Sequence, residues 1–428
     1  MSAELISILV LVVVFVIATT RSINMGALAF AAAFAVGELA ADLDADGIFA
    51  GFPGDLFVVL VGVTYLFAIA RANGTTDWLV HASIRLVRGR IALIPWVMFV
   101  ITGALTAIGA VSPAAVAIVA PIALSFAAQY GISPLLMGAM VVHGAQGGGF
   151  SPISIYGSIV NGIVERENLP GNELALFLAS LIVNVLIAGI VFVLFGGLKL
   201  GGRDTGKGAE GIDGDGPEGT EPAGNGASSR LDPAKIATLA ALVALVVAVL
   251  GFDLDAGLSA ITLAVILSAV WPDSSRKAVG EIAWSTVLLI CGVLTYVGVL
   301  EEMGTIDWAG EGVSDIGVPL LAAVLLCYIG AIISAFASSV GIMGALIPLA
   351  VPFLAQGEIG AVGMIAALAV SATVVDVSPF STNGALVLAA APDVDRERFF
   401  RQLMVYGGIV AAVVPAAVWL VLVVPGFG

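Results

Sequence analysis

Three serine–proline steps lie in the middle of long apolar runs, at Ser112-Pro113, Ser151-Pro152 and Ser378-Pro379. Proline disfavours helical geometry in the residue before it and fits the first turn of a helix, and serine can cap free amides there. Each step therefore predicts the start of a half-helix, whose N-terminus favours anions. The alternative for any single step is a kinked packing helix.

Residues suited to a cation precede two of these steps. The run Gly147, Gly148 and Gly149 loosens the chain before Ser151 and bares backbone carbonyls, although close helix packing through small residues is an alternative. Asp376, two residues before Ser378, is the one acidic residue that falls inside an apolar segment. An intramembrane carboxylate is by default a functional candidate, here neutralised by a coupling cation, and the alternative is a protonated or hydrogen-bonded structural residue.

Further polar groups lie close to the steps. Ser381, Thr382 and Asn383 follow the third step and offer hydroxyl and amide groups to a carboxylate or a cation. His143, in the apolar segment that leads to Ser151, is a possible substrate partner or proton carrier. The alternative for His143 is a purely structural role.

The composition places these residues in a membrane. Of the 428 residues 60% are apolar and only 11% are charged, and the mean hydropathy is +1.12. A soluble globule carries about 25% charged residues, so this chain is predicted to be an all-α polytopic membrane protein. The sequence has neither a phosphate-cradling Gly-Lys motif nor a His/Cys metal cluster, so we expect no enzyme, no cofactor beyond a coupling sodium or proton, and no nucleic-acid partner.

The apolar runs predict about ten transmembrane helices, two re-entrant hairpins and two interrupted helices. Spanning helices are predicted over residues 4–20, 23–41, 55–72, 172–197, 235–252, 256–271, 282–300 and 402–425. Residues 91–130 and 318–355 are each broken at the centre, by Ser112-Pro113 and by Ser338-Ser339, and predict the hairpins; a pair of full crossings is the alternative. Residues 133–164 and 360–391 predict the interrupted helices.

Both halves follow the same order of segments, which predicts an internal repeat. Gly74-Thr75 recurs as Gly304-Thr305, and Ser151-Pro152 recurs as Ser378-Pro379 at a slightly shorter offset. The first repeat is predicted over 1–200, with scaffold helices in 1–90, transport elements in 91–164 and a helix at 172–197. A disordered cytoplasmic linker follows over 201–234. The second repeat spans 235–428, with scaffold helices in 235–316, transport elements in 317–391 and a helix at 402–425.

Basic residues predict the orientation in the membrane. Threading the chain by the positive-inside rule leaves only Arg166 outside and puts both termini outside. Each half then has five crossings, an odd number, so the second repeat is inverted relative to the first.

The N-terminal half resembles the MatC-type dicarboxylate (malonate) carriers of the ion transporter superfamily, which are related to the divalent anion:sodium symporters. The stretches that carry the likeness are residues 51–55, 62–71, 108–121 and 143–156. The resemblance implies a homodimeric, elevator-type transporter that holds a di- or tricarboxylate between two hairpin tips, with sodium beside each tip. The symporters carry Ser-Asn-Thr at both tips, whereas this chain reads Val111-Ser112-Pro113 and Ser338-Ser339-Val340.

Together these features predict a symporter in the cell (inner or plasma) membrane that imports a small dicarboxylate such as malonate or a C4-dicarboxylate, coupled to sodium or protons. The alternatives are a transporter of a different anion (monocarboxylate, citrate, sulfate or oxyanion), an intramembrane enzyme and a channel. The predicted cation ligands are Gly147, Gly148, Gly149 and Asp376. The predicted substrate ligands are Ser112, Ser151, Pro152, Ser338, Ser339, Ser378, Pro379, Ser381, Thr382 and Asn383.

Overall fold

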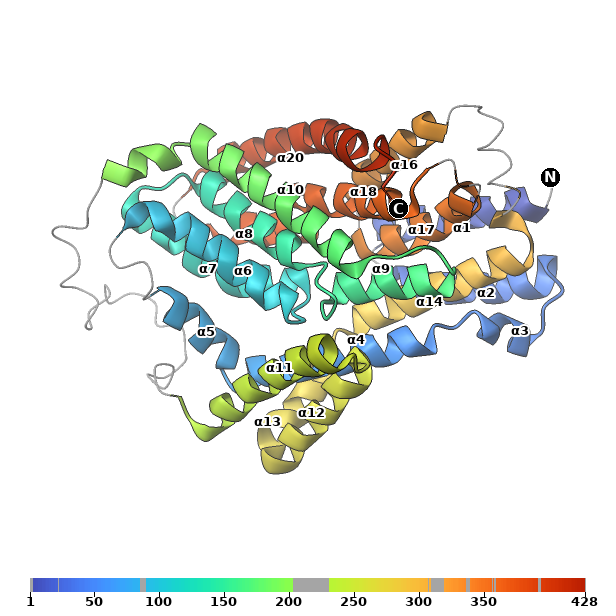
Figure 1. The fold of residues 1–428 in the computed structure, drawn as a ribbon, viewed down its shortest axis with the longest axis horizontal. Helices are drawn as coiled ribbons and strands as arrows, with labels where there is room; N and C mark the ends of the chain where they lie inside the picture. Colours follow the sequence, from blue (N-terminus) through green and yellow to red (C-terminus); the bar gives the residue numbers. More distant parts are fainter. Residues whose placement is uncertain are drawn as a thin grey trace.

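The structure is a computed structural model that describes residues 3–21, 23–84, 90–202, 231–306, 308, 319–335, 339–355, 357, 359–391 and 394–427. Within these ranges the chain is helical throughout and forms no strand (Figure 1). The greater part of the predicted linker, residues 203–230, lies outside the described residues, as does the predicted ligand Ser338.

Each predicted spanning segment forms a helix, so the all-helical prediction is confirmed. The first half comprises α1 (Ala3–Arg21), α2 (Met25–Ala40), α3 (Ala45–Ala50), α4 (Gly54–Ala72), α5 (Thr75–Ile84), η2 (Ile91–Leu93), α6 (Ile94–Ala107), α7 (Ser112–Tyr130), α8 (Pro134–Gly148), α9 (Ile155–Arg166), α10 (Glu173–Leu194) and η3 (Gly197–Gly202). The second comprises α11 (Pro233–Phe252), α12 (Ala256–Val270), α13 (Pro272–Ala278), η5 (Val279–Glu281), α14 (Trp284–Glu302), α16 (Pro319–Ser334), α17 (Ser339–Ala355), α18 (Ala361–Val374), η6 (Val375–Val377), α19 (Thr382–Ala390), α20 (Arg396–Val418) and the π-helical turn η7 (Trp419–Val423).

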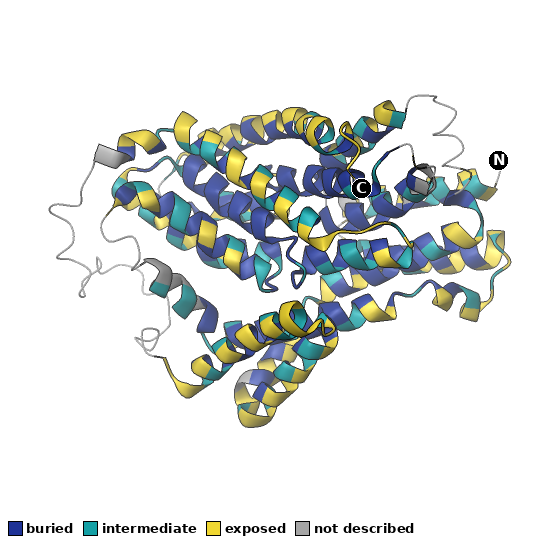
Figure 2. Cartoon of the chain, viewed as in Figure 1, coloured by how far each residue is buried: buried dark blue, intermediate teal, exposed yellow. Residues whose placement is uncertain are grey.

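Seven helical stretches in the described part of the chain are long and apolar enough to cross a bilayer. They are Gly54–Ala72, Ser112–Tyr130, Glu173–Leu194, Pro233–Phe252, Trp284–Glu302, Ala361–Ala390 and Arg396–Val423. The outer helices α10, α11, α12 and α20 carry many exposed residues, drawn in yellow in Figure 2, and leucine, valine and isoleucine are among them. Such faces suit lipid, because water would penalise their exposure.

Helices α8 and α18 form the centre of the bundle. Every residue of α8 from Leu135 to Gly148 is buried, and so is nearly all of α18. Polar groups on these two helices are therefore shielded from lipid by the helices around them (Figures 1 and 2).

The two halves pack across each other through close glycine contacts. A Cβ atom on Gly292 of α14 would lie 2.0 Å from the carbonyl oxygen of Gly26 of α2, and one on Gly62 of α4 would lie 2.5 Å from the carbonyl oxygen of Gly257 of α12. Helix α2 thus packs on α14 much as α12 packs on α4. Further along the chain, α9 packs against α17 and α19 packs against α7, so that each half contributes a broken helix to the other half's hairpin.

The helices that follow the two serine–proline steps at Ser151 and Ser378 begin three residues later than predicted. Helix α9 is capped by Ser154 and helix α19 by Ser381, so the prediction that Ser151 and Ser378 begin these helices is wrong. Each serine–proline step instead forms the turn before the cap, because the hydroxyl of Ser154 donates to the carbonyl of Ser151 (2.6 Å) and that of Ser381 donates to the carbonyl of Ser378 (2.8 Å).

The break predicted at the centre of residues 91–130 is a turn between α6 and α7. Helix α6 ends at Ala107, Gly109 adopts a left-handed φ of 115° and α7 begins at Ser112. Glycine is suited to this turn because other residues rarely adopt a positive φ. The prediction of a helix start at Ser112 is confirmed.

Candidate functional site

A cavity of about 560 Å³ lies where the two hairpins and the two broken helices meet. Its walls come from both halves of the chain: α1, α2 and α14 on one side, and the tips of α7 and α17 with α9, η6 and α19 on the other. The lining residues are Phe15, Ala18, Ile23, Asn24, Met25, Val111, Pro113, Tyr156, Ser285, Thr286, Leu289, Ser339, Val340, Asp376, Phe380, Thr382 and Asn383. Its volume is within the range of small-molecule sites.

Asp376 is the central polar group of this cavity. Its side chain is only 6% exposed and accepts two hydrogen bonds, from the Ser339 hydroxyl to Oδ1 (2.5 Å) and from Gln146 Nε2 to Oδ2 (2.7 Å). The Ser334 hydroxyl donates in turn to Ser339 (2.8 Å). One carboxyl thus joins α8 of the first half to the hairpin tip of the second.

Gln146 was not predicted from the sequence, although it lies only five residues before Ser151. It is fully buried, the Ser180 hydroxyl donates to its backbone carbonyl (3.0 Å), and its side-chain oxygen Oε1 has no partner in the described structure. A buried glutamine facing an intramembrane carboxyl would have been a usable signal, but only once α8 and η6 were known to be neighbours.

Asn383 connects the second broken helix to the first hairpin tip. Its Nδ2 donates to the Ser112 hydroxyl (2.8 Å), while its Oδ1 is buried without a partner among the described residues. Both Asn383 and its neighbour Thr382 line the cavity. The structure therefore brings Ser112 and Ser339, from opposite halves of the chain, together with Asp376 and Asn383 of the second broken helix.

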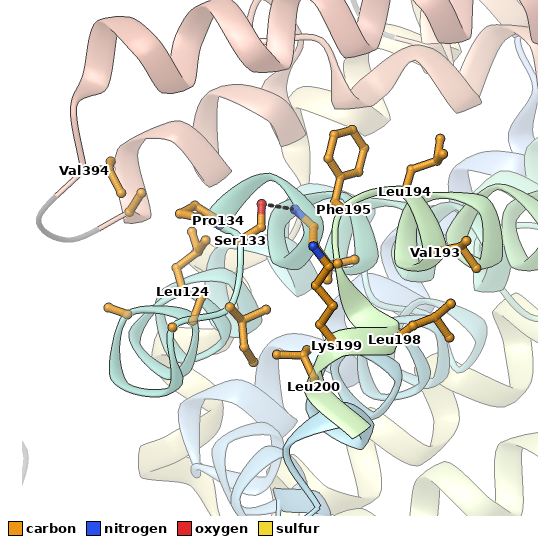
Figure 3. A pocket seen from close by; sticks show the side chains of 17 residues that line it. Leu124, Ser133, Pro134, Val193, Leu194, Phe195, Leu198, Lys199, Leu200 and Val394 are labelled. Atoms are coloured by element: carbon orange, nitrogen blue, oxygen red, sulfur yellow. Dashed lines mark hydrogen bonds between the residues drawn. The ribbon is translucent and has the colours of Figure 1, made fainter. Parts of the chain in front are cut away.

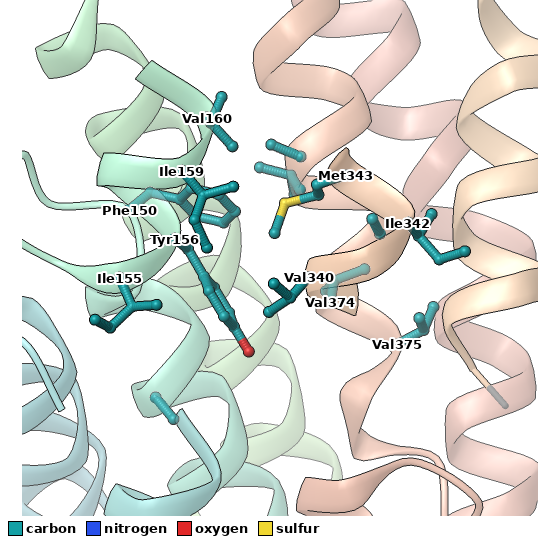
Figure 4. Close-up of a cluster of buried hydrophobic side chains, with 14 of the residues drawn as sticks. Phe150, Ile155, Tyr156, Ile159, Val160, Val340, Ile342, Met343, Val374 and Val375 are labelled. Atoms are coloured by element: carbon teal, nitrogen blue, oxygen red, sulfur yellow. The ribbon is translucent and has the colours of Figure 1, made fainter. Parts of the chain in front are cut away.

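Tyr156 also lines the cavity and was not predicted as a ligand. At the offset that relates Ser151 to Ser378, Tyr156 corresponds to Asn383, and the next residues, Gly157 and Gly384, also match. In Figure 4 its ring lies within a cluster that includes Phe150, Val340 and Met343, and its hydroxyl projects from the edge of that cluster. The cluster packs α9 against α17 beside the cavity.

The predicted cation ligands Gly147, Gly148 and Gly149 do not line the cavity. A Cβ atom on Gly148 would lie 1.9 Å from the carbonyl oxygen of Gly103, so Gly148 is required for close packing of α8 on α6. The carbonyl of Gly149 accepts the Ser154 hydroxyl (2.5 Å). In this structure these glycines serve packing and the turn, and Asp376 is the predicted cation ligand that reaches the cavity.

His143 is also remote from the cavity. Its Nδ1 lies 2.9 Å from Asn184 Oδ1 and its Nε2 lies 2.6 Å from the Tyr406 hydroxyl. Because Asn184 Nδ2 donates to the Ser180 carbonyl, Asn184 Oδ1 must accept from His143 Nδ1, which leaves Nε2 to accept from Tyr406. A neutral imidazole satisfies both contacts and ties α8 to α10 and α20.

The remaining predicted substrate ligands shape the breaks rather than the cavity wall. The Ser151 hydroxyl donates to the Ala107 carbonyl at the end of α6, and the Ser381 hydroxyl donates to the Asp376 carbonyl. Pro152, Ser378 and Pro379 lie in the same turns, next to these bonds. Their contacts hold η6 and the hairpins in place around the cavity.

The cavity combines partial positive charge with a single carboxyl. Helix α7 begins at its edge without a side-chain cap, and α17 begins there at Ser339, so two helix N-termini from different halves lie at the same cavity. Among the described lining residues there is no Lys, Arg or His. An anion could bind here only by backbone, hydroxyl and amide donors, and only if Asp376 were neutralised.

A larger groove, of about 1020 Å³, lies between the end of α7, the start of α8 and the end of α10 (Figure 3). Its lining is mainly apolar, with one charged side chain, Lys199. It contains none of the predicted ligands and no helix break. We therefore place the functional site in the smaller cavity, where the polar groups of both halves converge.

Comparisons with known proteins agree with the resemblance seen in the sequence. Residues 1–149 match the family described as the dicarboxylate carrier protein MatC N-terminus. No curated protein matches the chain. Among solved structures, the YdaH transporter of Alcanivorax borkumensis is similar in fold, with a TM-score of 0.55 and 14% sequence identity over 88% of this chain and 89% of that one.

The family match covers about a third of the chain, and the structural likeness extends over most of it. The predicted resemblance to MatC-type carriers is thus confirmed over residues 1–149. The family match over the N-terminal third, the likeness in fold to a transporter and the seven apolar helical stretches indicate a membrane carrier rather than an enzyme.

Proposed function

We propose that this protein is a secondary active transporter that imports a small dicarboxylate, such as malonate or a C4-dicarboxylate, by symport with sodium or protons. The observation that carries the proposal is the cavity in which two helix N-termini and the amide of Asn383 meet the buried Asp376. The N-termini and Asn383 supply donors for carboxylates. Asp376 carries the negative charge that a bound cation or proton must neutralise.

The charge of the cavity makes coupling necessary. Each elementary charge moved across 100 mV changes the free energy by about 2.3 kcal/mol, so a dianion alone is strongly opposed by a negative interior. An ionised Asp376 would also repel the substrate at close range. Binding a cation or a proton at Asp376 removes that repulsion, so that substrate and coupling ion are expected to bind together.

The movement is proposed to be of the elevator type. In this scheme α2, α4, α12 and α14 form the scaffold, and α6–α9 and α16–α19 form the moving transport elements. Two sets of contacts support the idea of two related halves. The scaffold helices pair at Gly26–Gly292 and at Gly62–Gly257, and α9 and α19 each pack against the hairpin of the other half. We further propose that the second half is inverted, that both termini lie outside the cell membrane and that the protein is a homodimer.

The test is uptake of labelled malonate into proteoliposomes that contain the purified full-length protein. A sodium gradient, a proton gradient and no gradient are compared, and unlabelled C4-dicarboxylate, citrate, monocarboxylate and sulfate compete for uptake. We expect accumulation only with a cation gradient and the strongest competition from dicarboxylates. Gradient-independent flux, or competition by sulfate or monocarboxylate alone, would contradict the proposal.

A further inference from the structure

We propose that Arg71 provides a second carboxylate-binding site, on the route between the substrate cavity and the surface of the protein. Its ligand is a carboxylate of the same small dicarboxylate, which takes the place of Glu281 on the Arg71 guanidinium. The inference rests on the proposed function and adds to it a site outside the substrate cavity, the cavity of about 560 Å³ described above.

Arg71 and Glu281 line a further cavity of about 280 Å³, which we call the Arg71 cavity. Its walls are the C-terminal half of α4, the tip of the first hairpin and the segment that leads into α14. The Arg71 cavity adjoins the substrate cavity, because Val111, Pro113 and Thr286 line both of them. The tip of the first hairpin therefore lies between the two cavities.

This tip packs directly on α4. A Cβ atom on Gly109, in the turn between α6 and α7, would lie 2.4 Å from Cγ1 of Val63 on α4. Passage of a substrate from one cavity to the other requires the tip to move away from α4. The proposed elevator mechanism assigns such a movement to this hairpin, relative to a scaffold that includes α4.

The contact with Glu281 uses only part of the Arg71 guanidinium. Arg71 Nε (3.1 Å) and Nη2 (2.7 Å) both donate to one oxygen, Oε2 of Glu281. A guanidinium carries five N–H hydrogens, and those that this contact does not use have no partner in the described part of the chain. Arg71 can therefore donate to an incoming carboxylate before it releases Glu281.

Exchange of Glu281 for a substrate carboxylate is expected to cost little free energy. The two side chains are 40% and 41% exposed, and ion pairs at such positions contribute little to stability because water solvates both charges. Arginine can hold both oxygens of a carboxylate through two parallel N–H bonds, whereas here it holds a single oxygen of Glu281. A dissolved carboxylate can therefore compete with Glu281 for Arg71.

The charges along the route favour an anion at Arg71. Among the described residues that line the two cavities, Arg71 is the only basic one. The N-termini of α7 and α14 also lie at the Arg71 cavity and add partial positive charge. In the proposed orientation α4 ends on the cytoplasmic side, so Arg71 would receive the substrate at its release. Glu281 would then return to the guanidinium and free the anion.

Protection of cysteines from an uncharged maleimide tests this inference on the purified full-length protein. Ala283→Cys reports on the Arg71 cavity and Thr382→Cys reports on the substrate cavity. The native cysteines, Cys291 and Cys327, are buried. Malonate is the probe, and potassium chloride keeps the ionic strength constant, so that screening of Arg71 does not change with the malonate concentration.

Each reporter is combined with Arg71→Gln, which removes the proposed ligand, and with Glu281→Gln, which removes its competitor. The matched control is Arg401→Gln, because it also breaks an exposed ion pair, with Glu397, but lines neither cavity. These three backgrounds are compared with the otherwise unchanged protein.

Malonate should slow the labelling of both reporters in the unchanged and Arg401→Gln backgrounds. In Arg71→Gln, the malonate concentration that gives half-protection of Ala283→Cys should rise at least about tenfold, while that of Thr382→Cys stays the same. In Glu281→Gln, half-protection of Ala283→Cys should need at least about threefold less malonate, because the competing carboxylate is gone.

Four results would overturn the inference alone. They are a Thr382→Cys reporter that is protected beside an Ala283→Cys reporter that is not, protection of Ala283→Cys that persists unchanged in Arg71→Gln, loss of protection at both reporters in Arg71→Gln, and an unchanged half-protection of Ala283→Cys in Glu281→Gln. The last of these decides the matter if Arg71→Gln does not fold.

Failure of the proposed function has a different signature. If no carboxylate of the competition panel protects Thr382→Cys in the otherwise unchanged protein, the proposed function fails, and the role of Arg71 in transport fails with it. Persistent protection of Ala283→Cys in Arg71→Gln would instead leave transport intact and make the ion pair a structural link between α4 and η5.

Discussion

At the scale of single residues, the structure separates polar groups that bind from polar groups that hold helices together. Asp376 and Asn383 lie at the cavity, and each has contacts to the other half of the chain. His143 is fully buried, and both of its ring nitrogens are bonded to neighbouring helices. A buried histidine in an apolar segment therefore does not indicate a binding role unless its ring nitrogens are free.

Replacement of His143 by leucine tests that separation. The change leaves Asn184 Oδ1 and the Tyr406 hydroxyl without a partner, which should reduce the free energy of unfolding by about 1–3 kcal/mol per unsatisfied group. We expect a lower melting temperature in detergent and an unchanged number of protons per transported substrate. A stable variant with an altered proton number would instead make His143 a proton carrier.

Glu167 offers a pH test outside the membrane-spanning helices. Burial, with the neighbouring Glu301 carboxylate, raises its pKa to about 7, against a smaller lowering by Arg166. Between the unfolded-state pKa of 4.5 and the folded-state pKa of about 7, the folded protein holds a proton on Glu167 that the unfolded chain has lost. The contribution of Glu167 to the free energy of unfolding is therefore fully present below the unfolded-state pKa, decreases as the pH rises, and is lost above about pH 7.

Glu167→Gln should consequently melt at a higher temperature than wild type at pH 8 and at a similar temperature at pH 4. The matched control is Glu165→Gln, an exposed position two residues earlier, which should change neither value. Equal melting temperatures of Glu167→Gln and wild type at pH 8 would show that ionised Glu167 is well solvated.

At the scale of elements, the glycine crossings set the distance between the scaffold helices. The carbonyl oxygen of Gly26 occupies the place that a side chain on Gly292 would need, so α2 and α14 can approach closely only with glycine there. The crossing of α4 and α12 at Gly62 and Gly257 has the same form.

Gly292→Ala should push α2 and α14 apart and lower stability by about 1–3 kcal/mol, the usual effect of overpacking. Gly189→Ala is the control, because a Cβ atom there would meet nothing within 4 Å and alanine favours the helix. The check is thermal unfolding of both variants in detergent. A Gly292→Ala variant as stable as Gly189→Ala would contradict the close crossing.

The elements themselves were largely predictable from the sequence. Long apolar runs and their breaks predicted the spanning helices, and the offset that relates Ser151 to Ser378 predicted where α7, α9, α17 and α19 correspond. The start of α9 was misplaced because Ser151 and Ser154 both suit a helix cap, and only the turn geometry shows that Ser154 is used. The partners of Asp376 were not predictable, because Gln146 and Ser334 become its neighbours only through tertiary packing.

At the scale of the whole molecule, the two halves share one site. Asp376 from the second half bonds Gln146 from the first, and Asn383 from the second half bonds Ser112 from the first. At the offset that relates Ser151 to Ser378, Asp376 corresponds to Gly149, so only the second half carries the carboxyl at this position. The central claim is that a carboxylate occupies the cavity at which these contacts converge.

Substrate protection of a cysteine in the cavity tests this claim most directly. Thr382→Cys places a thiol at an exposed position of the cavity wall, and the native Cys291 and Cys327 are buried. Ala128→Cys, in the larger groove beside α7, is the control. We predict that malonate slows labelling of Thr382→Cys by a small thiol reagent and leaves Ala128→Cys unchanged. Unaltered labelling of Thr382→Cys at malonate concentrations that saturate wild-type uptake would contradict the account.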